Sequence, residues 1–336
     1  GVMRFLTAGE SHGEELTGII EGLPSGLSVS AAFINDDLRR RRTAVGRGER
    51  MGLEHDEVRI TSGLFDGVTT GAPMTLHIKN ADNSGKRDFD FYRPGHVDYV
   101  GDFKYGYGDP ALASERGSAR ETAMRTAIGS VCKQLLGELN VTIESRVLEI
   151  GGESGDDMLS AVEMARRNGD TLGGKIWIGI KNLNAGIGSH VFWDRRLDYR
   201  LGGAFMSIPS VKAVEIGLGV DYANLSGKEV ADEFETPQKR SSNNCGGIEG
   251  GISNGEDIEF TLTLKPVPSL VGLKTINSSG QPCLTEKIRS DVCVCQAACV
   301  VAESVAAIEI ANAVIEVFGG DTMDELGARY YEKGKD

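Results

Sequence analysis

Six arginines lie within a short segment near the start of this chain. Residues 39–50 carry six positive charges and one negative, in a protein of 336 residues with a formal net charge of −13. Like charges at this density repel one another unless an anion lies among them. A guanidinium offers a planar set of donors that fits a phosphate or a carboxylate. The segment predicts a site for a small anionic ligand, through Arg39, Arg40, Arg41, Arg42, Arg47 and Arg50.

Two other interpretations of this segment are a solvated basic loop and a nucleic-acid patch. Domains that bind nucleic acid are usually basic overall, whereas this chain is acidic. We therefore favour the small ligand and expect no nucleic acid as a partner.

Two histidines stand in polar turns. The first turn is Gly9-Glu10-Ser11-His12-Gly13. The second is Arg93-Pro94-Gly95-His96-Val97-Asp98-Tyr99, which sets a histidine beside an arginine and an aspartate. A histidine can act as an acid or a base near neutral pH, although a single histidine is often structural. Neither turn has the G-x-S-x-G spacing that a serine hydrolase requires.

Two further segments combine arginines with an expected helix start, where unpaired N–H groups favour anions. Arg116-Gly117-Ser118-Ala119-Arg120 is expected to open one helix, and Arg289-Ser290-Asp291 precedes a long apolar one. Ser118 and Glu121 are also ordinary capping residues, so the first segment has that alternative.

Two glycine-rich segments fail to match the nucleotide-binding motifs that they resemble. Gly246-Gly247-Ile248-Glu249-Gly250-Gly251 would let a flat ligand lie on bare backbone, but it lacks the dinucleotide-binding pattern. Residues 169–175 have the spacing of a P-loop up to the lysine, and Ile176 then replaces the required hydroxyl residue. We expect neither a kinase nor an ATPase.

Period-2 and helical patterns predict the elements that must position these residues. Strands are expected at 2–8, 19–21, 58–63, 73–78, 142–150, 174–181 and 257–264. Helices are expected at 31–42, 122–139 and 158–167, within 292–318, and from 322 onward. Residues 79–118 are expected to form a long functional or mobile connection.

Composition describes an ordinary globular chain, 40% hydrophobic and 25% charged. The apolar run 292–318 is interrupted by Glu303, Glu309 and Glu316, so we expect a core helix and no membrane partner. Cys293, Cys295 and Cys299 lack a second ligand pair, and we expect buried thiols and no metal. No linker-like stretch divides the chain, so one domain over 1–336 and a cytoplasmic location are expected.

Taken together, these motifs resemble the chorismate synthase family. The resemblance rests on Gly9–Gly13, the arginine segment through Met51, Arg93–His96, Ser118–Thr122, Ser242-Asn243, and Arg289–Asp291 with Cys293, all in the family's order. It covers nearly the whole chain.

The resemblance implies a fold, a reaction and partners. The fold is α+β, a β-α-β sandwich of two antiparallel sheets with helices packed between them, assembled as a homotetramer. The enzyme is a carbon–oxygen lyase that removes phosphate from 5-enolpyruvylshikimate 3-phosphate by a 1,4-anti-elimination. The product, chorismate, ends the shikimate pathway, and the reaction needs reduced FMN, with NADPH as a possible reductant. A flavin- or NADPH-dependent reductase and a non-catalytic flavin- or phosphate-binding protein are the alternatives.

The resemblance also assigns residues. His12 would protonate the leaving phosphate, His96 would lie beside the flavin N1 edge, and Asp291 with Ser11 as relay would accept a proton from flavin N5. Arg41 and Arg47 would contact the phosphate of the substrate or of NADPH. Flavin contacts would come from Arg116, Gly117, Ser118, Pro209, Ser210, Gly250, Lys265, Pro266, Val267, Pro268, Ser269 and Arg289.

This chain departs from the family pattern at several of these places. Ala44-Val45 replaces Gly-Tyr, Gly117 replaces Ser, and Pro209-Ser210 replaces Asn-Ala. Val267-Pro268 interrupts the common Thr-Ser, and Gln296 stands where Pro is common. Backbone contacts to a flavin can survive such side-chain changes.

Overall fold

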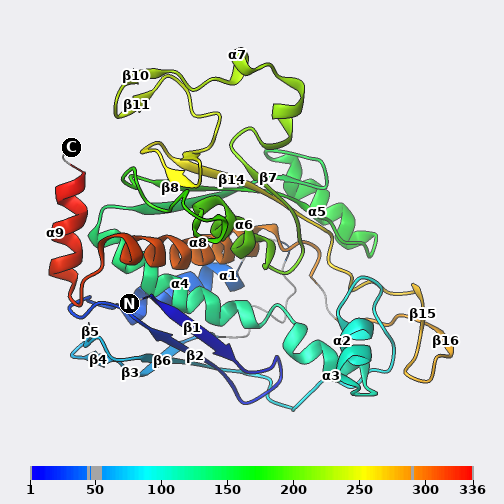
Figure 1. The fold of residues 1–336 in the computed structure, drawn as a ribbon. Coiled ribbons are helices and arrows are strands. Elements are labelled where there is room, and N and C mark those ends of the chain that lie inside the picture. Colours follow the sequence, from blue (N-terminus) through cyan, green and yellow to red (C-terminus); the bar gives the residue numbers. More distant parts are fainter. Residues whose placement is uncertain (1, 44–45, 47–54, 289–290, 335–336) are drawn as a thin grey trace.

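Two four-stranded antiparallel sheets enclose a layer of helices in this computed structural model (Figure 1). The structure describes residues 2–43, 46, 55–288 and 291–334. The expected α+β sandwich is therefore confirmed, and one hydrophobic core contains residues of both sheets and of the helices between them.

The first sheet has the strand order β1-β2-β6-β3. Its strands are β1 (Arg4–Ala8), β2 (Glu15–Glu21), β6 (Met74–Lys79) and β3 (Val58–Ser62). Along β6, Met74, Leu76 and Ile78 are buried while the residues between them are more exposed. This alternation places one face of the sheet against the helices.

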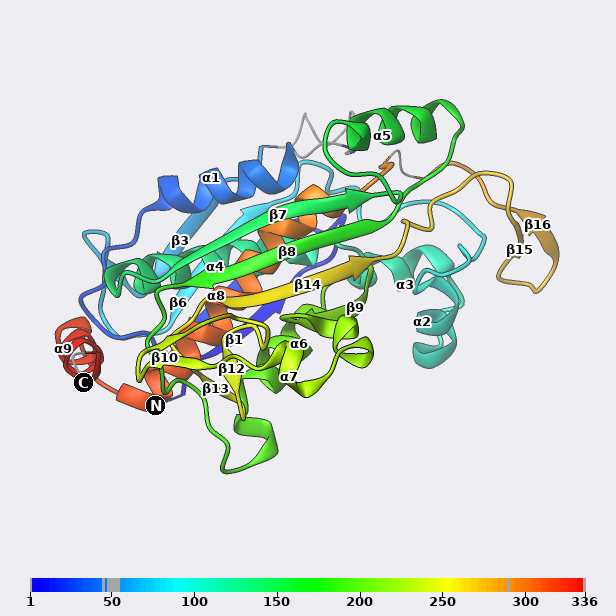
Figure 2. The same ribbon diagram turned by 90° about the horizontal axis from the view of Figure 1, so that it is seen from above.

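The second sheet has the order β7-β8-β14-β9. Its strands are β7 (Thr142–Ile150), β8 (Gly174–Lys181), β14 (Ile258–Leu264) and β9 (Val211–Ile216). Every second residue of β14, from Ile258 to Leu264, is buried, which again selects one face. Seen from above, β7, β8 and β14 lie over α8 (Figure 2).

The central layer consists of α1 (Ala31–Arg42), α4 (Glu121–Glu138) and α8 (Cys295–Phe318). Helix α8 packs on β7 and β8, α4 packs on β2 and β6, and the two helices contact each other. A Cβ atom on Gly129 of α4 would lie 2.4 Å from the Ser304 Cβ of α8, so only glycine permits this crossing. Helix α1 begins at Ser30, whose side chain accepts a hydrogen bond from the Phe33 N–H.

Helix α8 is long and apolar enough to cross a membrane by length and composition. However, 89% of its most apolar stretch is buried inside the protein. Cys293, just before the helix, and Cys295 and Cys299, in its first two turns, are also buried. This is as expected for small apolar residues. A helix buried on all sides needs no polar face, so the expectation of a core helix is confirmed.

The remaining elements surround these three layers. The helices are α2 (Asp98–Tyr105), α3 (Pro110–Gly117), α5 (Asp157–Arg167), α6 (Leu197–Met206), α7 (Gly227–Val230) and α9 (Met323–Lys333), with short 3-10 turns at Trp193–Arg195 and Gly219–Asn224. The small hairpins are β4 (Leu64–Phe65) with β5 (Val68–Thr69), β10 (Phe234–Thr236) with β11 (Lys239–Arg240), β12 (Ile248–Glu249) with β13 (Ile252–Ser253), and β15 (Lys274–Ile276) with β16 (Pro282–Leu284).

Two expectations for the middle of the chain are wrong. Residues 79–118 contain the helices α2 and α3 in place of one long connection. Arg116 does not open a helix, because it lies in the last turn of α3, and α4 begins only at Glu121. Helix α6 and strand β9 are further elements that the sequence patterns did not predict.

Candidate active site

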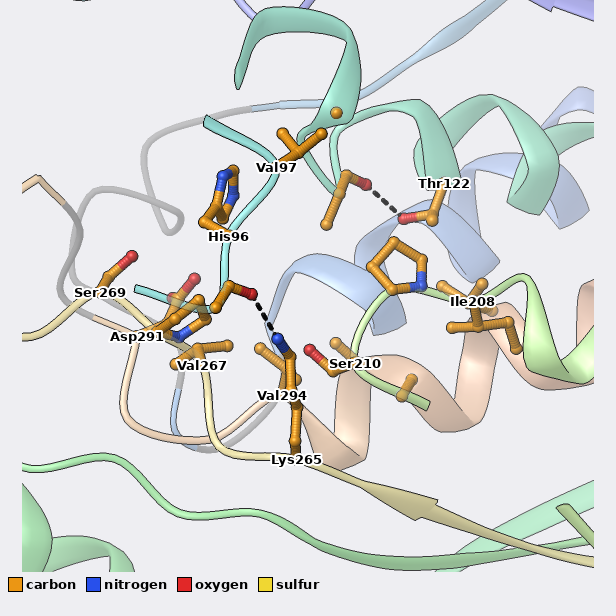
Figure 3. A pocket seen from close by; sticks show the side chains of 18 of the residues that line it. His96, Val97, Thr122, Ile208, Ser210, Lys265, Val267, Ser269, Asp291 and Val294 are labelled. Carbon is orange, nitrogen blue, oxygen red and sulfur yellow. Dashed lines mark hydrogen bonds between the residues drawn. The ribbon is translucent and has the colours of Figure 1, made fainter. Parts of the chain in front are cut away.

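A cavity of about 210 Å³ lies where α4 and α8 begin (Figure 3). Its wall comes from the end of α1, the turn before α2, the link between α3 and α4, the turn before β9, the segment after β14, and the start of α8. Helix N-termini carry partial positive charge, so the position favours an anionic group.

One side of the cavity is apolar and another is cationic. The apolar wall is formed by Val97, Ile208, Pro209, Val267, Pro268, Val294, Ala297, Ala298 and Val301. Arg41, Arg93 and Lys265 supply the positive charge. A flat apolar ring system that carries a negatively charged group would match both walls.

His96 reaches the cavity from a buried ion-pair cluster. Its Nδ1 lies 2.6 Å from Asp98 Oδ1, and Arg93 donates to the same carboxylate from Nε (2.8 Å), Nη2 (2.9 Å) and its backbone N–H (3.0 Å). A carboxylate accepts only, so His96 Nδ1 is the donor. The cluster fixes the orientation of the ring.

Asp98 is ionised within this cluster. Burial alone would raise the pKa of Asp98, but the hydrogen bonds and charges of His96 and Arg93 outweigh it and lower the pKa to about 2. The sequence placed Arg93 and Asp98 beside His96, but it predicted no functional role for either of them.

The segment after β14 holds the same turn from the other side. Lys265 Nζ donates to the Gly95 carbonyl over 2.5 Å, and this contact is drawn in Figure 3. Burial, with a smaller effect of the neighbouring Lys212, lowers the pKa of Lys265. The Lys265 backbone N–H donates to Ser210 O over 2.8 Å, which joins the 209–210 turn to the 265–269 segment.

The packing around residue 117 leaves no room for a side chain. A Cβ atom at this position would lie 2.3 Å from Val97 Cγ1, closer than side-chain atoms can approach. The β-branched Val97 therefore occupies the space of any side chain at residue 117. A serine at this position would therefore overlap Val97 unless Val97 moved.

The arginines of α1 have separate surroundings. Arg39 pairs with Asp36, and Arg40 pairs with Asp37 and with buried Glu303. Arg41, only 3% exposed, donates from Nε to Thr122 Oγ1 (3.1 Å) and from Nη2 to Ala119 O (3.0 Å), and it lines the cavity. Part of the predicted anion site is thus satisfied by the protein's own carboxylates.

A second buried ion pair supports the link before α4. Arg120 Nη1 donates to Asp56 Oδ2 over 2.8 Å and Arg120 Nε donates to Asn80 Oδ1 over 2.8 Å. Burial raises the pKa of Asp56, but Arg120, with smaller effects of Arg41 and Arg42, lowers it below its usual value. The arginines at the end of α1 therefore have an anionic neighbour in the folded protein.

His12 lies in a separate buried cluster beside the cavity. Its Nδ1 is 2.9 Å from Glu115 Oε1, and its Nε2 accepts from Arg87 Nε over 3.3 Å and lies 3.6 Å from Asp82 Oδ2. Ser118 Oγ donates to Ser11 Oγ over 3.4 Å, next to the cavity residues Gly117 and Ala119. The two predicted histidine turns thus approach the same region from different elements.

Ten of the predicted site residues form part of the cavity wall: Arg41, His96, Gly117, Pro209, Ser210, Lys265, Val267, Pro268, Ser269 and Asp291. Six others are described but do not contribute to it, namely Ser11, His12, Arg116, Ser118, Gly250 and Pro266. Arg47 and Arg289 lie outside the described residues.

Arg116 and Gly250 have other surroundings. The Arg116 guanidinium donates to the carbonyls of Thr7 and Gly9 at the end of β1. Gly250 lies in the turn between β12 and β13. In the same segment, Cβ atoms on Gly246 and Gly247 would meet backbone atoms of Gly217 and Asp257, so these two glycines serve backbone packing.

A family model described as chorismate synthase matches residues 3–315. This chain belongs to the chorismate synthase family. It is 47% identical to a chorismate synthase of Caldanaerobacter subterraneus subsp. tengcongensis, with 98% of this chain and 97% of that protein covered. It is 42% identical to the chorismate synthase of Geobacter sulfurreducens, with 98% of each covered.

The fold agrees with this membership. A solved structure described as the crystal structure of chorismate synthase is similar with a TM-score of 0.83 and 34% identity, covering 100% of this chain and 98% of that one. Members of the chorismate synthase family are lyases that use a flavin. The mixed apolar and cationic cavity is therefore the candidate flavin and substrate site.

Proposed function

We propose that this chain converts 5-enolpyruvylshikimate 3-phosphate to chorismate and phosphate with reduced FMN bound in the cavity. Family membership over nearly the whole chain supports the reaction. The observation that carries the proposal is the cavity itself, which joins an apolar wall to three cationic side chains and is lined by His96, held by the buried Asp98. His12, held by the buried Glu115, lies outside the wall.

The wall of the cavity fits a flavin. Val267, Pro268 and Ile208 offer apolar surface for a flat ring, and Gly95 and Gly117 also line the cavity. Arg93 and Lys265 offer donors to a phosphate or a flavin oxygen. Reduced FMN, when bound, supplies an electron that it regains, so the overall reaction has no net redox change.

The substrate carries one phosphate and two carboxylates, which suits the arginines around the cavity. Arg41 would bind the phosphate or a carboxylate from the end of α1, and Arg47 would do so from the segment that follows. The partial positive charge at the starts of α4 and α8 adds to the attraction.

The histidines have different tasks in this proposal. His12 would give the departing phosphate a proton from Nε2, starting as the doubly protonated ring and ending neutral, while Nδ1–H stays bonded to Glu115. His96 orients the reduced flavin through the cluster with Arg93 and Asp98. Asp291 lies on the cavity wall. Its carboxylate would accept the proton of flavin N5, with Ser11 as relay.

Other properties are proposed from the family alone. These are a homotetramer, a cytoplasmic location, and possible use of NADPH to reduce the bound FMN. Sedimentation of the purified protein tests the first. Anaerobic addition of NADPH to the protein with FMN, followed at the flavin absorption band, tests the last.

The test of the function is substrate turnover under anaerobic conditions. Purified protein is incubated with 5-enolpyruvylshikimate 3-phosphate and FMN that is either oxidised or reduced with dithionite. Chorismate should form only with reduced FMN. Formation of a reduced substrate in place of chorismate would favour the reductase, and binding without conversion would favour a non-catalytic protein.

A further inference from the structure

Glu115 is one of the most enclosed carboxylates in the protein. It lies in the last turn of α3, is 3% exposed, and faces the turn that follows β1. A buried carboxylate is costly unless its oxygens accept several hydrogen bonds. The hydrogen-bond donors around Glu115 are therefore informative.

The carboxylate of Glu115 holds His12 at two points. Its Oε2 accepts from the His12 backbone N–H over 2.8 Å, and its Oε1 lies 2.9 Å from His12 Nδ1. In addition, the Glu115 backbone carbonyl accepts from the Ser11 N–H over 3.1 Å. Neither the backbone nor the ring of His12 can rotate without loss of these contacts.

This arrangement determines which ring nitrogen carries the proton. An ionised carboxylate only accepts, so Nδ1 must be the donor to Glu115. A guanidinium N–H only donates, so in the neutral ring Nε2 accepts from Arg87. Asp82 is a further charged neighbour of Nε2, at 3.6 Å, and it would stabilise the ring once Nε2 is protonated.

We propose that Glu115 is the positioning residue of His12, which fixes the tautomer so that Nε2 is the nitrogen that takes and gives the proton. The inference rests on the proposed role of His12 in phosphate departure. Glu115 itself does not touch the substrate and acts only through the imidazole ring.

The test uses Glu115→Gln, which keeps the shape but replaces one accepting oxygen by an NH2 group. The ring then loses its fixed tautomer. We expect kcat to fall by roughly 100-fold or more, in the range of a lost general acid, with KM for the substrate within about twofold. Glu309→Gln is the matched control, because Glu309 is a half-buried glutamate of α8 that pairs with Arg200 of α6, and its kcat should equal that of the parent.

A double-variant cycle separates this role from a structural one. In a His12→Ala background, Glu115→Gln should change kcat by no more than about twofold, because its partner is gone. A further loss of about 100-fold in that background would overturn the proposal, as would parent-like kcat in the single variant. If Glu115→Gln does not fold, Glu115→Asp withdraws the carboxylate by one methylene, and parent-like kcat in that variant would equally overturn it.

A spectroscopic measurement needs no turnover. The protein has five histidines, so ¹⁵N-histidine labelling with a His12→Ala reference assigns the His12 signals. At a pH where the ring is neutral, the parent should show a protonated Nδ1 and an unprotonated Nε2, and Glu115→Gln should show a mixture. An unchanged tautomer would refute the inference even if the enzyme makes chorismate, and absence of chorismate from the parent would refute the function while leaving this result in force.

Discussion

The buried cluster of Arg93, His96 and Asp98 makes the sharpest prediction about stability. Asp98→Asn keeps the shape of the side chain but removes its charge. Arg93, 5% exposed, would then keep a buried positive charge with only a neutral amide opposite it. Breaking one side of a buried ion pair costs about 3–5 kcal/mol, and the remaining amide contacts place our estimate near 3 kcal/mol.

The same substitution has a defined pH dependence. Burial raises the pKa of Asp98, but His96 and Arg93 lower it from 3.8 to about 2. A lowered carboxylate pKa adds stability above the unfolded value, and this stability is lost as the pH falls toward the folded value. The parent should therefore lose roughly 1 kcal/mol through Asp98 between pH 6 and pH 3, and Asp98→Asn should not.

Urea unfolding at several pH values measures both effects, with chorismate formation assayed on the same samples. The matched control is Asp198→Asn, because Asp198 also accepts two hydrogen bonds from a nearby arginine, Arg196, but in a more exposed pair. The reasoning is refuted if Asp98→Asn costs no more than Asp198→Asn, or if the gap between parent and Asp98→Asn stays constant down to pH 3.

Three further predictions address the ligand sites. Arg47→Ala should weaken substrate binding by roughly 10- to 150-fold, as expected for loss of a charge-assisted hydrogen bond. Its melting temperature should be unchanged or higher. If calorimetry gives the affinity of the parent, the arginine segment is a solvated loop and not a ligand site. His12→Ala should mainly lower kcat, by about 100- to 10,000-fold. His96→Ala should also shift the absorption spectrum of the bound reduced flavin. A large fall in the melting temperature of either variant would mean that its histidine has a structural role. Gly117→Ser should lower the folding stability by about 1–3 kcal/mol through overlap with Val97. The double variant with Val97→Ala should regain that stability. If it does not, Val97 is not the cause of the loss.

The elements with clear periodicity could be predicted from the sequence. Helix α1 and strands β7 and β8 have the expected bounds, and α8 was predicted within a longer range. Most apolar residues of these elements face the core, with Phe33 of α1 as an exposed exception, so burial and pattern largely coincide. Helix α2 was missed because Tyr99, Val100 and Phe103 lie exposed, which leaves no inward stripe to detect. Helix α3 did carry a start signal, Asp109 as N-cap followed by Pro110.

The candidate site was only partly predictable for a different reason. Motifs pointed to His12, His96 and Arg41, since each lies in a polar or basic segment. Their partners could not be found by spacing, because Glu115 is 103 residues from His12 in sequence. Such pairs form only when the fold brings α3 against the turn after β1. Arg93 and Asp98 are closer to His96, but their burial depends on the whole surrounding structure.

The central claim is that the chain catalyses an elimination with reduced FMN and no net redox change. The most direct measurement is an anaerobic reaction of 5-enolpyruvylshikimate 3-phosphate with the protein and dithionite-reduced FMN, in which chorismate, phosphate and flavin absorbance are followed together. We expect chorismate and phosphate in equal amounts over many turnovers, with the flavin still reduced at the end. Oxidation of one flavin for each product formed would contradict the account and indicate a reductase.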